Sequence, residues 1–461
     1  MTTNYSVLDE IRELFSINAV SAIDYKTRIT DISTDTRTIQ PGAIFIAIVG
    51  DRFDGHKFIN TAIEKGAIAI VYNKNETISW VNDEGVCKFP VDDTIEAYQK
   101  IGNWWRNKFI NIPVIAVTGS VGKTTTKEII SAMLSSQGKI LKSIGNINNC
   151  IGVPQTILKL ESDFKFAVLE FGMDGRGQIA SYTKCCYPIQ IGVITTIGTA
   201  HIGRLGSELA ICEAKCELLA GMSPDGVAII NSDNQLLVEN YSRFWKGKTI
   251  TFGFETGEIR GEYRGDQIQV GEYLFQLPLP GKHNAANFLA GLAVMKALNI
   301  PWSNFAQGVA VSLPPQRSVR IALPQDIIFM DETYNASTQS VLATISLLKE
   351  IPGKRHIAVI GSLRDLGDQS ASIHHALGKD IDKIGIDLLV VLAIDPPTVE
   401  LANGAVNTKS LVFYTSNDLE KYLNSTLVAG DRVLFKASNT IGLLDTVNRV
   451  KDHFQTLHAS Q

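Results

Sequence analysis

The stretch Val114-Ile-Ala-Val-Thr-Gly-Ser-Val-Gly-Lys-Thr-Thr-Thr-Lys-Glu128 decides the fold of this chain. An apolar run from Val114 to Val117 ends at Thr118-Gly119, and Gly122-Lys123-Thr124 then lead into a helical pattern. In the order strand, glycine loop, helix, backbone N–H groups and a helix N-terminus face a phosphate chain. The sequence therefore predicts a nucleotide site at this loop, inside an α/β domain.

Two side chains of the loop have the chemistry that such a site needs. Lys123 is placed to reach the β- and γ-phosphates, and the hydroxyl of Thr124 is placed to hold Mg²⁺. The usual G-x-x-x-x-G-K-T spacing requires a glycine at position 117, where this chain has Val117. We therefore predict a compact Thr-Gly-x-x-Gly-Lys-Thr loop that binds a nucleoside triphosphate and Mg²⁺. An ordinary connection between a strand and a helix is the alternative interpretation.

Length and composition limit the possible classes of protein. A chain of 461 residues is too long for one core, so about three domains are expected. The net charge of −4 and the absence of a dominant basic stripe argue against a nucleic-acid partner. No apolar run approaches the roughly 20 residues of a membrane span, and no signal-peptide pattern is visible. We therefore expect a cytoplasmic protein that does not bind a membrane and whose six cysteines are reduced thiols.

The alternation of strand and helix patterns predicts an α/β protein of three domains. They are a small α/β N-terminal domain, a central P-loop domain with a largely parallel, ATPase-like sheet, and a C-terminal Rossmann-like domain. Their predicted bounds are 1–110, 111–317 and 318–461. No G-x-G-x-x-G follows a strand, so a dinucleotide site is not predicted.

Several local features refine this organisation. Ser6 is predicted to cap a helix that ends near Ile17, and residues 51–56 are predicted to form a turn. Residues 249–279 alternate with turn signals and are predicted to form a β-meander. Cys212 and Cys216 are one helical turn apart, and we interpret them as packed thiols, with a metal site as the alternative.

Polar residues follow predicted strands of the central domain. Glu170 ends a strand and His201 follows the next one, where ligands bind in a parallel sheet. Glu170 is therefore a candidate Mg²⁺ ligand, with helix capping as the alternative. The loop 144–154 carries three asparagines suited either to ligand binding or to ordinary turns. Three uses of the nucleotide remain open: work or switching, phosphoryl transfer, and activation of a carboxylate for bond formation.

Nine motifs, taken in order, resemble the Mur ligase family of peptidoglycan synthesis over essentially the whole chain. They are Ser33-Thr-Asp-Thr-Arg37, Asp54-Gly-His56, Thr118-Gly-Ser-Val-Gly-Lys-Thr-Thr125, Asn146-Ile-Asn-Asn149, Glu170-Phe-Gly-Met173, His201-Ile-Gly203, Ala214-Lys215, Gly281-Lys-His-Asn284 with Asn287, and Asp331-Glu-Thr-Tyr-Asn335. Each motif alone is weak, but their joint order is specific. The pattern is most similar to the branch that joins D-alanyl-D-alanine (D-Ala-D-Ala) to UDP-N-acetylmuramoyl-tripeptide (UDP-MurNAc-tripeptide).

The resemblance implies a role for each matching residue. ATP is bound by Gly119, Ser120, Val121, Gly122, Lys123, Thr124 and Thr125, with Asn284, Asn287, Arg317, Asp331 and Asn335. Mg²⁺ is held by Thr124, Glu170, His201 and a carbamylated Lys215, and the catalytic residues are Lys123, Lys215 and His201. The UDP-sugar side comprises Thr34, Asp35, Arg37, Asn146, Asn148 and Asn149.

The resemblance also implies an activity for each domain. The first binds the UDP-linked peptide, the second binds ATP, and the third closes over the site and binds the dipeptide. The product is an amide formed through an acyl phosphate, and the protein is expected to be a monomer. Two departures stand out: Gln316 precedes Arg317 where glycine is usual, and Asn439 ends a Lys-Gly-Ser-Arg pattern in place of arginine.

Three alternatives remain at this stage. A Mur ligase that adds diaminopimelate or lysine is the nearest, although no Asp-Asn-Pro-Arg occurs in the last domain. Folylpolyglutamate synthetases share the last two domains but lack a first domain of this kind. A P-loop switch or a binding protein without catalysis is the alternative from another class.

Overall fold

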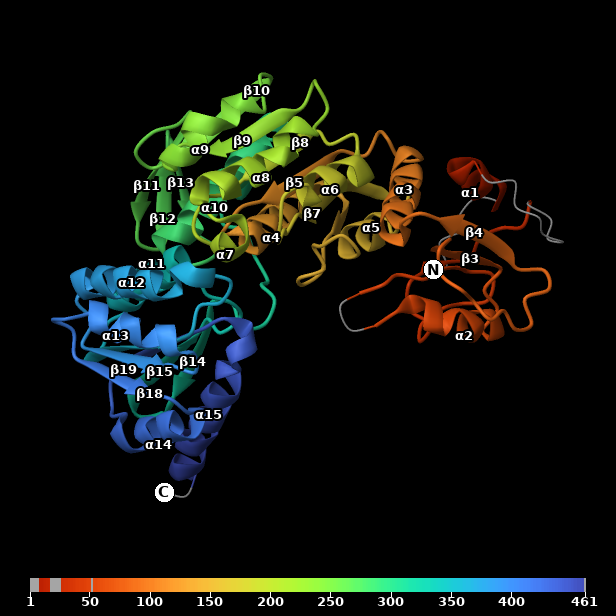
Figure 1. Ribbon diagram of the computed structural model, residues 1–461. Coiled ribbons are helices and arrows are strands. Elements are labelled where there is room, and N and C mark those ends of the chain that lie inside the picture. The colour runs from red at the N-terminus through yellow and green to blue at the C-terminus, as the bar shows by residue number, and fades with distance from the viewer. Residues whose placement is uncertain (1–7, 17–25, 51–52, 460–461) are drawn as a thin grey trace.

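The computed structural model describes residues 8–16, 26–50 and 53–459 of the chain. Within these ranges it contains three sheets, of four, nine and six strands. Figure 1 shows the central sheet and its helices between the first and third sheets, which lie at opposite ends of the molecule. The three-domain α/β architecture is confirmed. Ser6 and Ile17, predicted as helix ends, and residues 51–52 of the predicted turn lie outside the described residues.

The first sheet is parallel and carries helices α1 (Leu8–Phe15), α2 (Ile59–Glu64) and α3 (Thr94–Asn107). Its strands, in spatial order, are β1 (Ile32–Ser33), β2 (Ile44–Ile46), β3 (Ala69–Asn73) and β4 (Cys87–Val91). All three residues of β2 are buried, as expected for a strand covered on both faces.

Helix α3 joins the first sheet to the central one. Asp93 caps it by accepting hydrogen bonds from the N–H groups of Ile95 and Glu96. Trp105 Nε1 donates to the carbonyl of Leu160 at 2.9 Å, so the indole packs against the central domain with its polar group satisfied. Arg106 is fully buried beside it, and burial lowers its pKa to about 10.

The central sheet runs in the order β13-β12-β11-β10-β9-β8-β5-β7-β6. Its strands are β5 (Val114–Thr118), β6 (Lys139–Lys142), β7 (Phe164–Glu170), β8 (Ile191–Ile194), β9 (Val227–Asn231), β10 (Lys248–Gly253), β11 (Ile259–Arg264), β12 (Gln267–Val270) and β13 (Tyr273–Gln276). Its helices are α4 (Lys123–Leu134), α5 (Gly152–Ile157), α6 (Gln178–Cys186), α7 (Ile202–Leu205), α8 (Glu208–Ala220), α9 (Gln235–Asn240) and α10 (Lys282–Ala297). Strand β5 is buried throughout and lies between β7 and β8.

The prediction of a meander over 249–279 is wrong for its first strand. β10 pairs in parallel with both β9 and β11, and the antiparallel part comprises β11 to β13. The cause is Asp233, whose carboxylate accepts hydrogen bonds from the backbone N–H groups of Phe254, Glu255 and Thr256. These bonds hold a loop that returns the chain to the start of β11 rather than turning it into a hairpin.

The third sheet runs in the order β14-β15-β19-β16-β17-β18, and its pairs are parallel except for β14 with β15. The strands are β14 (Val319–Leu323), β15 (Ile327–Asp331), β16 (Arg355–Gly361), β17 (Leu388–Leu392), β18 (Ser410–Phe413) and β19 (Asp431–Lys436). The helices are α11 (Thr338–Glu350), α12 (Ser370–Ile384), α13 (Glu400–Gly404), α14 (Ser416–Thr426) and α15 (Leu443–Ala459). This is the predicted Rossmann-like arrangement.

Several close contacts join the third domain to the central one. Thr199 Oγ1 lies 2.8 Å from Thr338 Oγ1 at the start of α11. On α7, Gly203 N donates to the carbonyl of Asp365 at 2.9 Å, and Gly203 packs directly on Gly367. A Cβ on Gly203 would overlap the Gly367 nitrogen, and a Cβ on Gly367 would lie 3.0 Å from the Gly203 Cα. The two backbones therefore touch without side chains between them.

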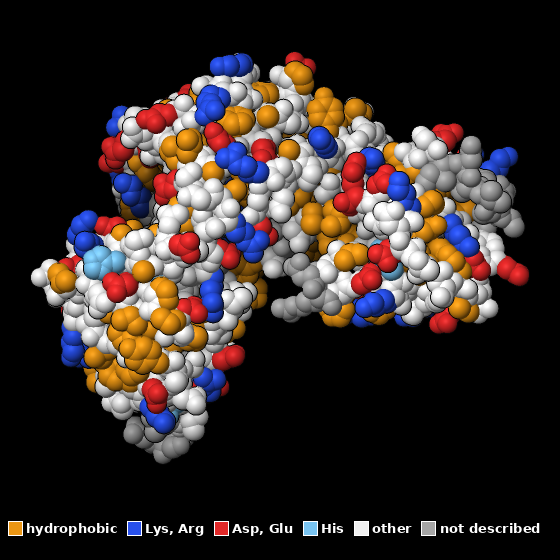
Figure 2. Space-filling view, in the orientation of Figure 1, with side chains coloured by type: hydrophobic (Ala, Val, Ile, Leu, Met, Phe, Trp, Pro, Cys, Tyr) orange, Lys and Arg blue, Asp and Glu red, His pale blue; other side chains and the backbone are white. Residues whose placement is uncertain are grey.

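The surface agrees with the charge balance of the sequence. Figure 2 shows acidic and basic side chains interspersed over the face in view, without a broad region of one sign. Among the described residues, no helix is long and apolar enough to cross a membrane.

Candidate active site

A cleft of about 1070 Å³ lies between the central and third domains. Its central-domain wall contains the loop after β5 and the loop that carries Asn146, Asn148 and Asn149. Its third-domain wall contains residues that follow β15, β16 and β19. Because both sheets are largely parallel, these segments lie at the carboxyl ends of strands, where α/β proteins bind ligands.

The phosphate loop is held by bonds to the neighbouring strand end. Ser120 N donates to the carbonyl of Thr196 at 2.8 Å, and Thr195 Oγ1 donates to the carbonyl of Val121 at 2.5 Å. Lys123 Nζ folds back onto the loop and donates to the carbonyl of Gly119 at 2.8 Å. Burial lowers the pKa of Lys123, and the charge of Glu170 opposes this shift. The loop therefore presents a preformed cradle with one ammonium group at its centre.

Replacement of Gly119 by alanine is expected to destabilise the protein by about 1–3 kcal/mol and to weaken nucleotide binding. A Cβ there would overlap Thr195 Oγ1, and the φ of 151° favours glycine. Thermal unfolding and ADP titration check both effects. Gly175→Ala is the matched control, because no atom lies within 4 Å of a Cβ at that position. Equal melting temperatures for the Gly119→Ala and control variants would contradict the proposed loop geometry.

Glu170 is the carboxylate at the centre of the site. It ends β7, is only 2% exposed, and accepts hydrogen bonds from Thr124 Oγ1 and Asn148 Nδ2, each at 2.8 Å. A hydroxyl and a carboxylate beside a phosphate loop are the oxygen donors that Mg²⁺ prefers. The described residues contain no group of three or more His, Cys, Asp or Glu arranged to hold a metal.

Lys215 and His201 lie behind and beside the phosphate loop. Lys215, on α8, is 1% exposed, and burial lowers its pKa well below the usual value, with the charge of Lys123 adding to the shift. His201 lies in the left-handed region with φ of 69°. Burial lowers its pKa to about 4, and Lys123 and Lys215 add to the effect. His201 is therefore neutral near pH 7, and for Lys215 burial shifts the equilibrium toward the neutral amine.

The His201 ring also has an unused nitrogen. Within the described part of the chain, Nδ1 is buried and makes no hydrogen bond; the carboxylates of Asp174 and Asp365 are 3.5 and 3.7 Å away. Because it is buried without a hydrogen-bond partner among the described residues, this imidazole nitrogen is available to a ligand of the cleft.

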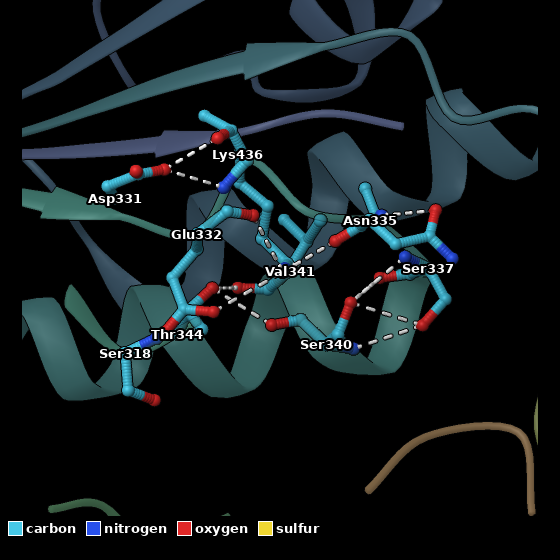
Figure 3. Close-up of polar contacts among 11 residues, drawn as sticks. Ser318, Asp331, Glu332, Asn335, Ser337, Ser340, Val341, Thr344 and Lys436 are labelled. Atoms are coloured by element: carbon cyan, nitrogen blue, oxygen red, sulfur yellow. Dashed lines mark hydrogen bonds and ion pairs between the residues drawn. The ribbon is translucent and has the colours of Figure 1, made fainter. Parts of the chain in front are cut away.

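Two more cationic groups line the same cleft, Arg317 at the end of the central domain and Lys436 in the third domain. The Arg317 guanidinium lies over the Tyr334 ring at 3.8 Å from its centroid, and its buried Nε has no hydrogen-bond partner among the described residues. Lys436, 3% exposed, donates to the carbonyl of Asn335 at 2.9 Å, and its Nζ is 3.9 Å from Glu332 Oε2 (Figure 3). Burial lowers the pKa of Lys436. Two basic side chains thus join Lys123 around one space, which suits a polyphosphate.

The structure brings most of the predicted site residues together. Those that line the cleft are Ser120, Val121, Gly122, Lys123, Thr124, Thr125, Asn146, Asn148, Asn149, Glu170, His201, Asn284, Asn287, Arg317 and Asn335. Gly119 and Lys215 lie directly behind this lining. Asp331 does not line the cleft; its carboxylate accepts hydrogen bonds from the backbone N–H and the hydroxyl of Thr333, and its charge partly offsets the lowering of the Lys436 pKa by burial.

Three predicted substrate residues lie apart from the cleft. Thr34, Asp35 and Arg37 belong to the first domain and follow β1. Arg37 forms an ion pair with Asp35 at 2.6 Å, which holds the pKa of that carboxyl below its usual range. Asn148, predicted for the UDP-sugar side, lines the cleft and donates to Glu170.

Sequence reasoning missed several residues of the site. Thr195 donates a hydrogen bond to the phosphate loop, and the Tyr334 ring packs against the Arg317 guanidinium. Glu332 lines the cleft and accepts from Ser318 N at 3.0 Å, whereas its neighbour Asp331 was the residue predicted to bind the nucleotide. The alternation of side chains along a strand could have identified Glu332, since adjacent residues point to opposite faces. Arg364, in the loop after β16, lacked any such signal.

Comparison with known proteins shows which family this chain is similar to. Residues 28–104 match the description "Mur ligase family, catalytic domain", residues 117–295 match "Mur ligase middle domain", and residues 317–439 match "Mur ligase, glutamate ligase domain". The UDP-N-acetylmuramoyl-tripeptide–D-alanyl-D-alanine ligase of Synechocystis sp. is 46% identical over 432 residues, which are 94% of each chain.

Solved structures agree. MurF from Acinetobacter baumannii superposes with a TM-score of 0.88 at 27% identity, over 98% of this chain and 99% of that one. MurF ligase from Thermotoga maritima, solved in complex with ADP, gives a TM-score of 0.80 at 26% identity, over 92% and 98% of the two chains. The order of the domains, the cleft and these relatives lead to one conclusion: the chain belongs to the Mur ligase family.

Proposed function

We propose that this protein is an ATP-dependent ligase that joins D-Ala-D-Ala to UDP-MurNAc-tripeptide. The observation that carries the proposal is the single cleft in which Lys123 and the Thr124–Glu170 pair face Arg317 and Lys436. The relative from Synechocystis is named for this reaction and covers nearly the whole chain. The use of ATP and a nucleotide-linked precursor places the reaction in the cytoplasm, where we expect the protein to act as a monomer.

The cleft residues suit the transfer of a γ-phosphate to a carboxylate. Lys123, Arg317 and Lys436 would offset the negative charge that gathers when the two anions meet. The resulting acyl phosphate is attacked by the amine of the dipeptide, the C–N bond forms, and phosphate leaves with the C–O electron pair. Closure of the two domains over the cleft would exclude water from this intermediate, which would otherwise be hydrolysed.

Mg²⁺ fits the donor set found here. Thr124 and Glu170 would hold one ion beside the nucleotide phosphates. The His201 imidazole would be a metal ligand near Lys215. The bound ion neutralises phosphate charge and polarises the transferred group. Asn148 positions Glu170 by donating to its second oxygen.

We assign each domain a part of the reaction. Residues 1–110, with Thr34, Asp35 and Arg37, hold the UDP-linked peptide. Residues 111–317 bind ATP, with Asn284 and Asn287 at the nucleotide. Residues 318–461 close over the site and bind the dipeptide. Asp331 acts indirectly in this scheme, by fixing the Thr333 turn that precedes Asn335.

Lys215 is expected to carry a carbamate. Burial lowers the pKa of Lys215 and so favours the neutral amine that reacts with CO₂, and the resulting carboxylate-like group would be a Mg²⁺ ligand. Native mass spectrometry at neutral pH should show an added mass of one CO₂ that is lost on acidification. The addition should be absent from Lys215→Ala and retained by Lys184→Ala, a control on the surface of α6. An unmodified wild-type protein in bicarbonate buffer would contradict this expectation.

The overall function is tested by ADP release from the purified protein. UDP-MurNAc-tripeptide and ATP with D-Ala-D-Ala should give continuous ADP release and an extended peptide product. Omitting the dipeptide should abolish continuous release. Turnover with diaminopimelate or lysine on the UDP-MurNAc-dipeptide, but not with D-Ala-D-Ala, would overturn the assignment in favour of the single-amino-acid ligase.

A further inference from the structure

The cleft contains more basic side chains than ATP requires. Lys123 serves the phosphate loop, the half-buried Arg317 lies over Tyr334, and the buried Lys436 donates to the carbonyl of Asn335. Two arginines remain among the described lining residues, Arg204 on α7 and Arg364 in the loop after β16. These positions are available to a second anionic substrate.

Arg364 is the better anchored of the two. Its backbone N–H donates to Ser438 Oγ at 2.9 Å, which ties the loop after β16 to the loop after β19. Its NH1 lies 3.1 Å from Asp395 Oδ1, so one side of the guanidinium is held in place. The side chain is nevertheless 46% exposed, and it faces the cleft beside Ser438 and Asn439.

Asp395 thus holds one edge of the Arg364 guanidinium, and the other edge is available to a ligand. Within the described residues, no hydrogen bond or ion pair involves Arg364 Nε or NH2. Arginine presents donors in a planar fork that matches the two oxygens of a carboxylate. Lys436, by contrast, already donates to the carbonyl of Asn335 and lies near Glu332.

We propose that Arg364 binds the carboxylate of the incoming dipeptide and thereby selects an acceptor with a free C-terminus. The proposal deepens the function proposed above and rests on it. The dipeptide carries its nucleophilic amine and its carboxylate at opposite ends. A carboxylate held by Arg364 on the third domain leaves the amine to extend toward the acyl phosphate held on the central domain.

Asp395 is the positioning residue in this arrangement. It holds NH1 and so orients the remaining fork, which lowers the entropy lost when the carboxylate binds. Asp395 is part exposed, so its charge is screened and does not prevent a second carboxylate from approaching the guanidinium.

Steady-state kinetics of Arg364→Ala test the proposal. We expect the KM for D-Ala-D-Ala to rise by about 10- to 100-fold, because a charge-assisted bidentate pair is lost. The KM values for ATP and UDP-MurNAc-tripeptide should be unchanged. Arg364→Lys should recover part of the loss, since a point charge replaces the fork. Arg449→Ala, which removes an exposed ion pair with Glu420 on the same domain, is the matched control.

A dipeptide that lacks the charge gives an independent readout. Wild-type protein should use D-alanyl-D-alaninamide with a KM about 10- to 100-fold above that of the free acid, and Arg364→Ala should no longer distinguish the two. Asn439→Arg should restore part of the discrimination in the Arg364→Ala background, because position 439 lines the cleft beside Arg364.

The outcomes separate this inference from the function itself. A protein that turns over D-Ala-D-Ala, and whose Arg364→Ala variant keeps both its KM and its preference for the free acid, overturns the role of Arg364 alone. A wild-type protein that does not use D-Ala-D-Ala overturns the proposed function. If Arg364→Ala unfolds, Arg364→Lys and the amide substrate on wild-type protein decide: an equal KM for acid and amide counts against the proposal.

Discussion

Replacement of Lys123 by alanine is expected to lower kcat for ADP release by about 100- to 1,000-fold. Its ammonium group lies at the centre of the phosphate loop, close enough to Glu170 for their charges to interact. It would offset charge on the transferred phosphoryl group, an interaction that is stronger in the transition state than in the bound substrate. The loss should therefore fall on kcat more than on KM for ATP.

The fold should tolerate this change. Lys123 is half-buried and desolvation lowers its pKa, so its charge opposes folding, and alanine favours the first turn of α4. The melting temperature of Lys123→Ala should therefore match that of the wild type. Lys248→Ala, exposed at the start of β10, is the control and should keep full activity. Full turnover by Lys123→Ala would remove the phosphate loop from the mechanism.

Replacement of Glu170 by glutamine is expected to reduce kcat by about 100-fold or more and to raise the Mg²⁺ concentration needed for half-maximal activity. Glutamine keeps the shape of the side chain but removes the charge. Its amide offers one acceptor where Glu170 accepts from Thr124 and Asn148 on separate oxygens. One of those donors must then lose its partner in a buried site.

The dependence on Mg²⁺ separates a metal ligand from a structural carboxylate. If Glu170 holds Mg²⁺, activity of the Gln variant should rise with Mg²⁺ beyond the concentration that saturates the wild type. If Glu170 only braces Thr124 and Asn148, the Mg²⁺ requirement should stay the same while stability falls. Glu272→Gln, exposed at the β12–β13 turn, controls for the loss of one negative charge.

Much of the phosphate-binding wall was predictable because its residues are contiguous in the sequence. Positions 118–125 combine a buried strand, glycines and a helix start, and each of these has a local signature. Glu170 was found by the rule that parallel strands end at the ligand site. The three-domain α/β fold was also predictable, because strand and helix patterns alternate along the chain.

The third-domain wall was harder to predict, because it depends on contacts between distant segments. Arg364 and Ser438 are neighbours through one hydrogen bond across 74 positions of sequence. Whether Glu332 or Asp331 lines the cleft depends on how the chain is oriented at the end of β15. Thr333 fixes this orientation by donating two hydrogen bonds to Asp331. The parallel pairing of β10 with β11 depends on Asp233, far from the loop that it holds. No local propensity encodes such contacts.

Gln316 shows how a departure from the family pattern is accommodated. Gln316 and Ser318, on either side of Arg317, have φ values of 65° and 51°. A left-handed backbone explains why glycine is usual before the arginine, since glycine adopts it without strain. Here the strained residue is stabilised by Tyr334 N, which donates to the carbonyl of Gln316 at 3.3 Å.

The contact of Gly203 with Gly367 has an evolutionary consequence. A mutation at either position adds atoms between the two backbones, and even alanine at Gly203 would overlap the Gly367 nitrogen. Neither residue touches the phosphate loop, yet each limits how near the third domain can come to it. Substitutions can therefore change the side chains around the cleft one at a time. The width of the cleft, by contrast, depends on keeping glycine at both positions 203 and 367.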